Sequence, residues 1–257
     1  MKFARVYGQR HEAQPNLSGE CPACESPVVA KCGEVRIWHW AHKGRRLCDP
    51  WWENETEWHR AWKNLFPVEW QEIVHPAENG ERHIADVKTG DGWVLEFQHS
   101  PIRPDERRSR DAFYPKLIWV VDGTRRKRDR AQLIWAWEQG GRVGRNALLR
   151  TVFSDGCGLL REWAVSNAPI FFDLGEAERL WWLVGKGAHG SAYLQPFSRA
   201  EFIGWHLNTA TEASRQLSEF VSIELPRLIA AYDSRPRTPP MTWDPLQPRR
   251  IRRPFRF

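Results

Sequence analysis

Short apolar strands alternate with amphipathic helices through the middle of the chain. Two runs in which polar and apolar residues alternate, 82–88 and 93–99, are joined by a Thr-Gly-Asp-Gly turn and predict a pair of strands. The apolar run 116–122 predicts a buried strand, and charged or amphipathic segments at 104–114 and 128–138 predict helices. The expected architecture is a mixed sheet flanked by helices, which is an α/β or α+β fold.

A further helix is expected ahead of the two strands. Asn54 is a typical N-cap, Glu57 follows three residues later, and Pro67 follows the expected end of the helix. At about 100° per residue, a Glu and a His fall on the apolar edge of this helix, where they are costly unless they have partners. The residues of this narrow arc are Glu55, His59, Trp62 and Phe66.

The composition separates the chain into four parts. The first holds four of the five cysteines, and the second carries the helices and strands described above. The third has a second α+β pattern, with strands expected at 169–174 and 179–184 and one or two helices over 198–232, interrupted at Pro226. The fourth is rich in Pro and Arg without apolar periodicity and is expected to be extended or disordered. The boundaries are 1–50, 51–140, 141–233 and 234–257.

The formal net charge of +6 favours a polyanionic partner. Nucleic acid is the expected one, because Lys and Arg side chains that neutralise phosphates release counterions. No apolar run approaches the ~20 residues that a membrane span requires, and the first residues lack the apolar stretch of a signal peptide. The protein is therefore expected in the cytoplasm, where thiols stay reduced and the cysteines need an explanation other than disulfides.

Two pairs of potential metal ligands stand in the first part, separated by fourteen residues. Cys21 and Cys24 flank a Pro-Ala turn, and a hairpin between the pairs can bring His39 and His42 back to the cysteines. Two thiolates and two imidazoles at such spacings suit tetrahedral Zn²⁺. A closed four-ligand site is structural, so this zinc-finger-like module is expected to fold the first part and to be able to touch nucleic acid. Two reserve ligands, either of which could replace a histidine, are Cys32 and Cys48.

Two carboxylates and an amide are expected to converge on the two strands. Side chains two positions apart share a face of a strand, so Glu96 and Gln98 point the same way, and the turn can bring Asp86 beside them. A hard divalent cation such as Mg²⁺ needs ligands of this kind next to a phosphate. A solvated pair on a sheet edge is the alternative, but Glu96 interrupts an apolar run, which favours a metal-dependent nuclease core.

The order of these residues resembles the PD-(D/E)xK nuclease superfamily: an inward Glu on a helix, an Asp, nine residues and then Glu-x-Gln. In that superfamily the Asp and the first Glu bind metal, and the third position, usually Lys, orients or activates the attacking water. The resemblance implies Mg²⁺ or Mn²⁺ at Asp86 and Glu96, assistance from Glu55, and a water oriented by Gln98. The sequence departs from the pattern at Ala85, where the superfamily has Pro, and at Gln98, which cannot act as a general base.

The two motifs together, in this order, resemble the competence protein CoiA family over roughly residues 15–125. Both ligand pairs of the first part match the N-terminal segment of that family, with Trp40 in place of Phe. The resemblance implies a restriction-endonuclease-like core that acts on DNA in a bacterial context of DNA uptake, recombination or defence, with recombination or defence proteins as further partners. The remaining matches are Glu55-Thr-Glu-Trp-His59 with Lys63, Ala85-Asp86-Val87, Glu96-Phe-Gln98-His-Ser100, Arg110 to Tyr114, and Ile118-Trp119.

Five further residues are candidates to contact the DNA backbone. His59 or Lys63 would reach the phosphate beside the metal. Arg107 and Arg110 lie one helical turn apart, with Tyr114 beyond them, and would grip the backbone. The alternatives are an internal i,i+4 pair within the first helix and a solvated face of the second.

The sequence therefore predicts a Mg²⁺-dependent deoxyribonuclease that hydrolyses phosphodiester bonds. The rival hypothesis is a non-catalytic DNA-binding or recombination-mediating scaffold that keeps the fold, because Gln98 stands where the superfamily usually has Lys and because fold and function separate easily. A third hypothesis is a zinc protein whose function lies in the unmatched C-terminal half, beyond roughly residue 140.

Overall fold

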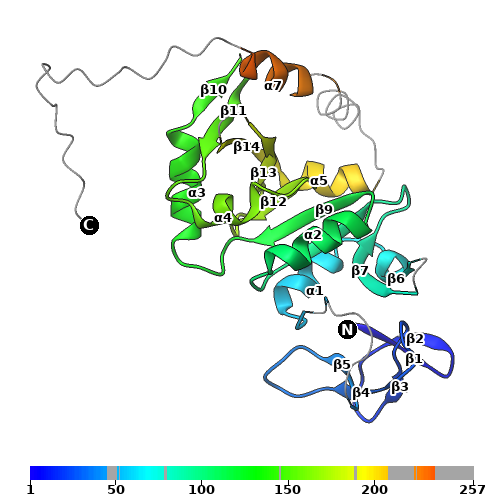
Figure 1. Ribbon diagram of the computed structural model, residues 1–257. Helices are drawn as coiled ribbons and strands as arrows, with labels where there is room; N and C mark the ends of the chain where they lie inside the picture. The colour runs from blue at the N-terminus through cyan, green and yellow to red at the C-terminus, as the bar shows by residue number, and fades with distance from the viewer. Residues whose placement is uncertain are drawn as a thin grey trace, which may run out of the picture.

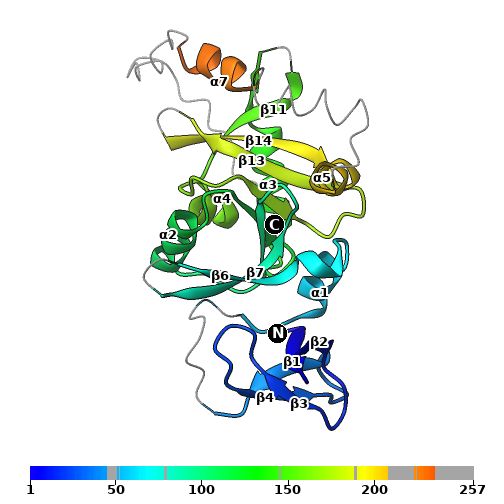
Figure 2. The same cartoon turned by 90° about the vertical axis from the view of Figure 1, so that its right-hand side faces the viewer.

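The computed structural model describes residues 1–44, 51, 53–77, 80–144, 146–187, 190–207, 223 and 225–234. Within these residues the strands form two sheets, one of five strands and one of nine. Figures 1 and 2 both show the smaller sheet at one end of the molecule, beside the larger one.

The smaller sheet is antiparallel throughout, in the order β2-β1-β3-β4-β5. Its core contains Ala4, Val6, Val28 and Trp40, none more than 5% exposed, and the Trp40 indole donates to the His11 carbonyl oxygen at 2.9 Å. So few apolar side chains make a weak core, and small units of this kind usually need a metal or a partner surface. The strands are β1 (Phe3–Val6), β2 (Gln9–Glu12), β3 (Ser18–Glu20), β4 (Pro27–Lys31) and β5 (His39–His42).

The larger sheet is mixed, in the order β10-β11-β14-β13-β12-β9-β8-β7-β6. Strand β9 pairs in parallel with β8 on one side and with β12 on the other. All six residues of β9 are buried, as expected for a central strand that is covered on both faces. The strands are β6 (Gln71–Pro76), β7 (Arg82–Lys88), β8 (Val94–Gln98), β9 (Leu117–Asp122), β10 (Gly141–Val143), β11 (Asn146–Phe153), β12 (Ile170–Asp173), β13 (Arg179–Lys186) and β14 (Ser191–Ser198).

Helices cover both faces of the larger sheet. Trp119 of β9 belongs to one core cluster together with Leu133, whereas the next residue, Val120, belongs to a second cluster together with Trp62 and Phe202. This alternation confirms the expected mixed sheet flanked by helices. The helices are α1 (Glu57–Lys63), the 3₁₀ turn η1 (Val68–Trp70), α2 (Pro104–Phe113), α3 (Asp129–Glu138), α4 (Gly158–Trp163), α5 (Arg199–His206) and α7 (Leu225–Asp233).

The first helix begins later than the sequence suggests. Thr56, not Asn54, is its N-cap, and the Thr56 hydroxyl accepts a hydrogen bond from the backbone N–H of His59. Thr56 has the extended conformation of an N-cap residue and stands three positions before the N–H that it satisfies. Glu55 therefore lies just before α1 rather than on the inward edge of the helix.

The expected boundary at residue 140 falls between strands of one sheet. Strand β12 comes from the third part of the chain and pairs with β9 of the second, so the sheet continues without a break.

Strand β6 is an addition to the expected elements, because Gln71 and Glu72 at its start hide the apolar alternation. Pro226 lies in the first turn of α7 instead of interrupting a helix, and Pro is tolerated there because that N–H needs no helical partner. The basic tail beyond Ser234 lies outside the described residues.

Asp173 at the end of β12 ties α1 and α5 to the sheet. Its Oδ2 accepts hydrogen bonds from the indole N–H groups of Trp58 at 3.0 Å and Trp62 at 2.9 Å. Its Oδ1 accepts one from the Arg199 guanidinium at 2.6 Å. Only 5% of the Asp173 side chain is exposed. These buried hydrogen bonds give Asp173 a structural role, although an acid at the end of a strand can also be catalytic.

The Asp173→Ala variant is expected to lose about 3–5 kcal/mol of unfolding free energy, because the Arg199 charge and two indoles lose their buried partner. Urea unfolding followed by circular dichroism measures this loss. The exposed Asp155 is the matched control, and Asp155→Ala should stay within about 0.5 kcal/mol of wild type. Equal stability of the two variants would contradict the assigned role of Asp173.

Candidate functional site

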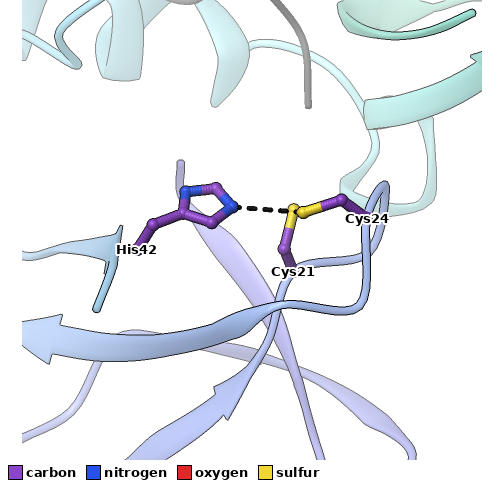
Figure 3. A group of neighbouring side chains, drawn as sticks. All are labelled: Cys21, Cys24 and His42. Carbon is purple, nitrogen blue, oxygen red and sulfur yellow. Dashed lines mark hydrogen bonds between the residues drawn. The ribbon is translucent and has the colours of Figure 1, made fainter. Parts of the chain in front are cut away.

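A cysteine–histidine cluster, consisting of Cys21, Cys24 and His42, lies at the edge of the smaller sheet. The turn between β3 and β4 supplies both cysteines, and the register pairs His42 of β5 with Val28, next to that turn. The ligand atoms of the three residues lie within 4.8 Å of one another, and Cys24 Sγ is 3.4 Å from His42 Nε2. Figure 3 shows the three side chains pointing toward one another.

The turn that carries the cysteines is held from both sides. Within it, the Cys21 N–H donates to the Ser26 carbonyl oxygen at 2.9 Å, and Glu25 adopts a left-handed φ of 62°. From the larger sheet, Arg82 of β7 donates to the Ala23 carbonyl oxygen at 2.8 Å. Two thiols on a fixed turn and an imidazole from β5 are a donor set that suits zinc, with the cysteines ionised.

The structure brings together three of the four predicted zinc ligands. His39 stands three residues before His42 on the same strand, and this odd spacing points the two side chains to opposite faces. The His39 ring instead bonds through Nδ1 to the Ile37 carbonyl oxygen at 2.9 Å. Cys32 lies beside His39 in a shallow groove away from the cluster, and Cys48 lies outside the described residues.

A small charged cavity of about 60 Å³ lies where the start of the chain meets α1 and strands β6, β7 and β8. This volume has room for a few water molecules or a hydrated ion. Its wall carries both carboxylates and basic side chains, and we refer to it as the charged cavity. Its lining consists of Met1, Trp51, Glu53, Glu55, His59, Lys63, Glu72, Ile84, Asp86, Glu96, Phe97, Arg110 and Tyr114.

Three carboxylates lie around the ammonium group of Lys63, which lines this cavity. Its Nζ lies 2.8 Å from Glu55 Oε2, 2.9 Å from Glu72 Oε1 and 3.8 Å from Asp86 Oδ1, and its side chain is only 2% exposed. Burial lowers the pKa of Lys63, but the charges of Glu72, Glu55 and Asp86 outweigh burial and raise that pKa above its usual range. Lys63 therefore stays protonated and neutralises carboxylates inside the protein, instead of being presented to a phosphate at the surface.

Glu72 joins the two sheets. Its carboxylate accepts hydrogen bonds from the backbone N–H groups of Lys2 at 2.6 Å and Phe3 at 2.9 Å, in addition to the Lys63 ammonium. Its own backbone has a φ of 47°, a strained conformation for a residue other than Gly, which the surrounding contacts must hold. Burial raises the pKa of Glu72, but Lys63 and the backbone donors outweigh burial and lower that pKa to about 2.

Asp86 and Glu96 lie on the neighbouring strands β7 and β8 and both line the charged cavity. The paired residues of the two strands end at Val87 and Leu95, immediately beside Asp86 and Glu96. Asp86 Oδ2 accepts a hydrogen bond from the Phe97 N–H at 3.0 Å, and Glu96 Oε2 lies 2.9 Å from the Arg110 guanidinium. Burial raises the pKa of Asp86, although the charges of Lys63 and His59 oppose that rise.

The predicted metal-binding carboxylates line one cavity without forming a tight cluster. Glu55, Asp86 and Glu96 all belong to the lining of the charged cavity. In the described part of the chain, however, only the cysteine–histidine cluster gathers three potential metal ligands within 4.8 Å.

Gln98 lies behind the cavity wall and positions Glu53. Its Nε2 donates to Glu53 Oε2 and to the Ser100 carbonyl oxygen, both at 2.9 Å, while its buried Oε1 has no hydrogen-bond partner among the described residues. Glu53 also accepts the Ser100 N–H and lies 3.5 Å from His59 Nε2. Burial lowers the pKa of His59, but the hydrogen bond to Glu53 and the charges of Asp86 and Glu53 outweigh burial and raise it.

The residues expected to grip a DNA backbone from α2 are turned inward. Arg107 donates to the Glu162 carbonyl oxygen and lies over the Trp163 ring, and Arg110 pairs with Glu96. These two residues and Tyr114 are at most 6% exposed, so they are bound within the protein rather than on a solvated face. Their long or aromatic side chains pack over the sheet, and the pairing of Arg110 with the buried Glu96 explains its inward direction.

Two carboxylates of the charged cavity, Glu53 and Glu72, were not expected from the sequence. Glu72 follows a Gln at the start of an unexpected strand, and Glu53 stands among aromatic residues ahead of α1. The only local signal is an acidic residue next to apolar ones, and this arrangement is too common in sequences to identify a site.

A comparison with protein-family models matches residues 13–50 to the competence protein CoiA, N-terminal domain. The matched segment contains the cysteine–histidine cluster and links this chain to competence proteins. Searches of curated proteins and of solved structures return no match. The helices of the described part of the chain are all too short or too polar to span a membrane.

The structure predicts that His42 and His39 differ in their importance for zinc. Purified His42→Ala is expected to lose most of its bound zinc because it removes a ligand of the cluster, while His39→Ala is expected to keep it. Elemental analysis of both variants and wild type measures the zinc-to-protein ratio. Zinc loss in His39→Ala, or full retention in His42→Ala, would contradict the cluster.

Glu72→Gln is expected to lower the free energy of unfolding by about 3 kcal/mol at neutral pH, since the pKa of Glu72 lies near 2 in the folded chain and near 4.5 when unfolded. A lowered carboxyl pKa contributes stability that is complete above pH 4.5 and is lost as the pH falls toward 2. The stability difference between wild type and Glu72→Gln should therefore shrink across this range. Chemical unfolding at several pH values measures it, and the exposed Glu69→Gln is the matched control. A difference that does not change with pH would refute the assignment.

Proposed function

We propose that this chain, whose residues 13–50 match the N-terminal domain of a competence protein, is a metal-dependent nuclease that hydrolyses phosphodiester bonds in DNA. The observation that carries the proposal is the common position of Asp86 and Glu96, which come from the neighbouring strands β7 and β8 and line the same charged cavity. The family match and the excess of positive charge support DNA as the substrate and a bacterial context of DNA uptake, recombination or defence.

The donor set of the cavity fits Mg²⁺ or Mn²⁺. Both are hard cations that take carboxylate oxygens, and Mg²⁺ usually keeps several waters and binds only one or two protein carboxylates. Asp86 and Glu96 can therefore hold the ion without a third close carboxylate, with Glu55 assisting from the other side of Lys63. When bound, such an ion lowers the pKa of a water molecule and neutralises charge on the phosphate.

The other residues of the cavity would support this reaction. Lys63 fixes Glu55 and lies beside Asp86, which limits the mutual repulsion of the carboxylates. His59 lines the cavity, and because its pKa is raised it can present a positive charge to a phosphate oxygen. Gln98 cannot take a proton, but its unpartnered Oε1 can accept a hydrogen bond from water and its Nε2 holds Glu53 in place.

A non-catalytic scaffold that binds DNA is the second candidate. Two observations favour it. The Lys63 ammonium already neutralises Glu55 and Glu72. In addition, no three carboxylates among the described residues gather closely enough to form a metal site with three protein ligands. A scaffold would keep the fold and the cysteine–histidine cluster and would act through recombination or defence proteins.

Cleavage of labelled single- and double-stranded DNA with Mg²⁺ or Mn²⁺ is expected for wild type and should disappear with EDTA. Asp86→Ala and Glu96→Gln should lose at least about a hundredfold in cleavage rate while keeping DNA binding, because they remove only the metal ligands. Asp91→Ala is the matched control, since Asp91 is exposed in the turn that joins the same two strands. Gel-shift binding and zinc content are measured alongside. DNA binding by wild type without cleavage under either metal would favour the scaffold.

A further inference from the structure

His99 and Asp122 stand side by side at the carboxyl ends of two parallel strands. The register pairs Gln98 of β8 with Val121 of β9, and His99 and Asp122 are the next residue along each strand. The carboxyl end of parallel strands is where open α/β sheets generally bind their ligands. The sequence alone gave His99 no partner, because Asp122 is 23 residues away.

Asp122 fixes the orientation of the His99 ring. The carboxylate is 3% exposed, and its Oδ1 accepts hydrogen bonds from the N–H and the hydroxyl of Thr124 at 2.8 and 2.7 Å. Its Oδ2 lies 2.7 Å from His99 Nδ1. A carboxylate acceptor assigns the ring proton to Nδ1 and leaves Nε2 as the atom that exchanges a proton. The backbone is held as well, because Arg125 donates to the His99 carbonyl oxygen at 2.9 Å.

The ring of His99 lies beside His59, one of the residues that line the charged cavity. It is 5.9 Å from the ring of His59, which lines the cavity, and 6.2 Å from the ring of Trp58, measured between ring centres. One third of the side chain is exposed, and Nε2 has no hydrogen-bond partner in the part of the chain that the structure describes. His99 thus combines a fixed Nδ1 with a partly exposed ring that lies near a lining residue of the charged cavity.

From this geometry we infer that His99, positioned by Asp122, donates the proton to the leaving oxygen of the phosphodiester, an inference that rests on the proposed function. The other polar groups of the site are less suited to this role, since Lys63 stays protonated between carboxylates and Gln98 has no acidic proton. The two ring nitrogens of His59 face Glu53 and the Thr56 hydroxyl. Histidine is the side chain that most often acts as a general acid or base in enzymes.

The proton balance of the step is simple. Hydroxide formed from water attacks the phosphorus, and the bond from phosphorus to the leaving oxygen breaks. The leaving oxygen keeps the bonding electron pair and takes the proton from His99 Nε2. The neutral imidazole then regains a proton from solvent, which had received one when the attacking water ionised.

Substrates whose leaving atom needs no proton provide the test. Each oligonucleotide carries one linkage in which sulfur replaces either the 3′ or the 5′ bridging oxygen, and cutting is compared with that at the same linkage in ordinary DNA. A thiolate leaves without protonation, so the sulfur linkage should make His99 dispensable. His99→Gln should cut the ordinary linkage at least about a hundredfold more slowly and the matching sulfur linkage within about fivefold of wild type.

The other variants separate the possible outcomes. Asp122→Asn should show the same selective loss, because its amide oxygen can still accept from Thr124 while its amide nitrogen cannot accept the proton of His99 Nδ1. Asp86→Ala should lose cleavage of both substrates. His11→Gln is the control for a histidine outside the site, and zinc content and circular dichroism report folding. If His99→Gln slows cleavage of both linkages equally, or slows neither, the role of His99 is overturned while the proposed nuclease function stands. A wild-type protein that cuts neither substrate overturns the proposed function itself, and the inference with it.

Discussion

The buried ammonium of Lys63 is the charge on which this structure depends. It neutralises Glu55 and Glu72 and lies near Asp86, so one cation connects the segment before α1 with strands β6 and β7. Removing any member of such a buried group leaves an uncompensated charge. The resulting loss of stability is much larger than the net stability that the intact ion pair contributes. The same constraint explains why so many acidic side chains can line a small cavity. It also keeps the carboxylates in place before any cation binds.

The two sheets depend on each other through this cavity. Glu72 accepts the backbone N–H groups of Lys2 and Phe3, and the Lys2 ammonium reaches Gln71 at 2.9 Å. On the other side, Arg82 of the larger sheet holds the turn between the two cysteines. A small sheet with a weak core gains stability from such contacts and from a bound metal. The segment that matches the competence protein domain contacts the larger sheet through Ala23, while Met1, ahead of that segment, lines the charged cavity.

The larger sheet places chemistry at the ends of its central strands. Strands β8, β9 and β12 run in parallel, and their carboxyl ends bring His99, Asp122 and Asp173 to one edge. Asp173 is used to anchor indoles and Arg199, while Asp122 anchors His99. Two acids of similar position thus have different roles, which only their partners reveal. The continuity of the sheet past residue 140 means that the third part of the chain supports the proposed site instead of forming a separate unit.

The sequence by itself determined the features that depend on short spacing. The two-residue alternation of β8, the turn after β7 and the close pair of cysteines are local, so the placement of Asp86 and Glu96 on neighbouring strands could be predicted. The cysteine–histidine cluster could be predicted as well, apart from His39. Tertiary structure alone decided the partners of the buried charges: Glu53 with Gln98, Glu72 with Lys63, and His99 with Asp122. It also turned Arg110 inward to Glu96. The physical reason is that a buried charge must find its counter-charge wherever the fold brings one, and that choice leaves no pattern along the chain.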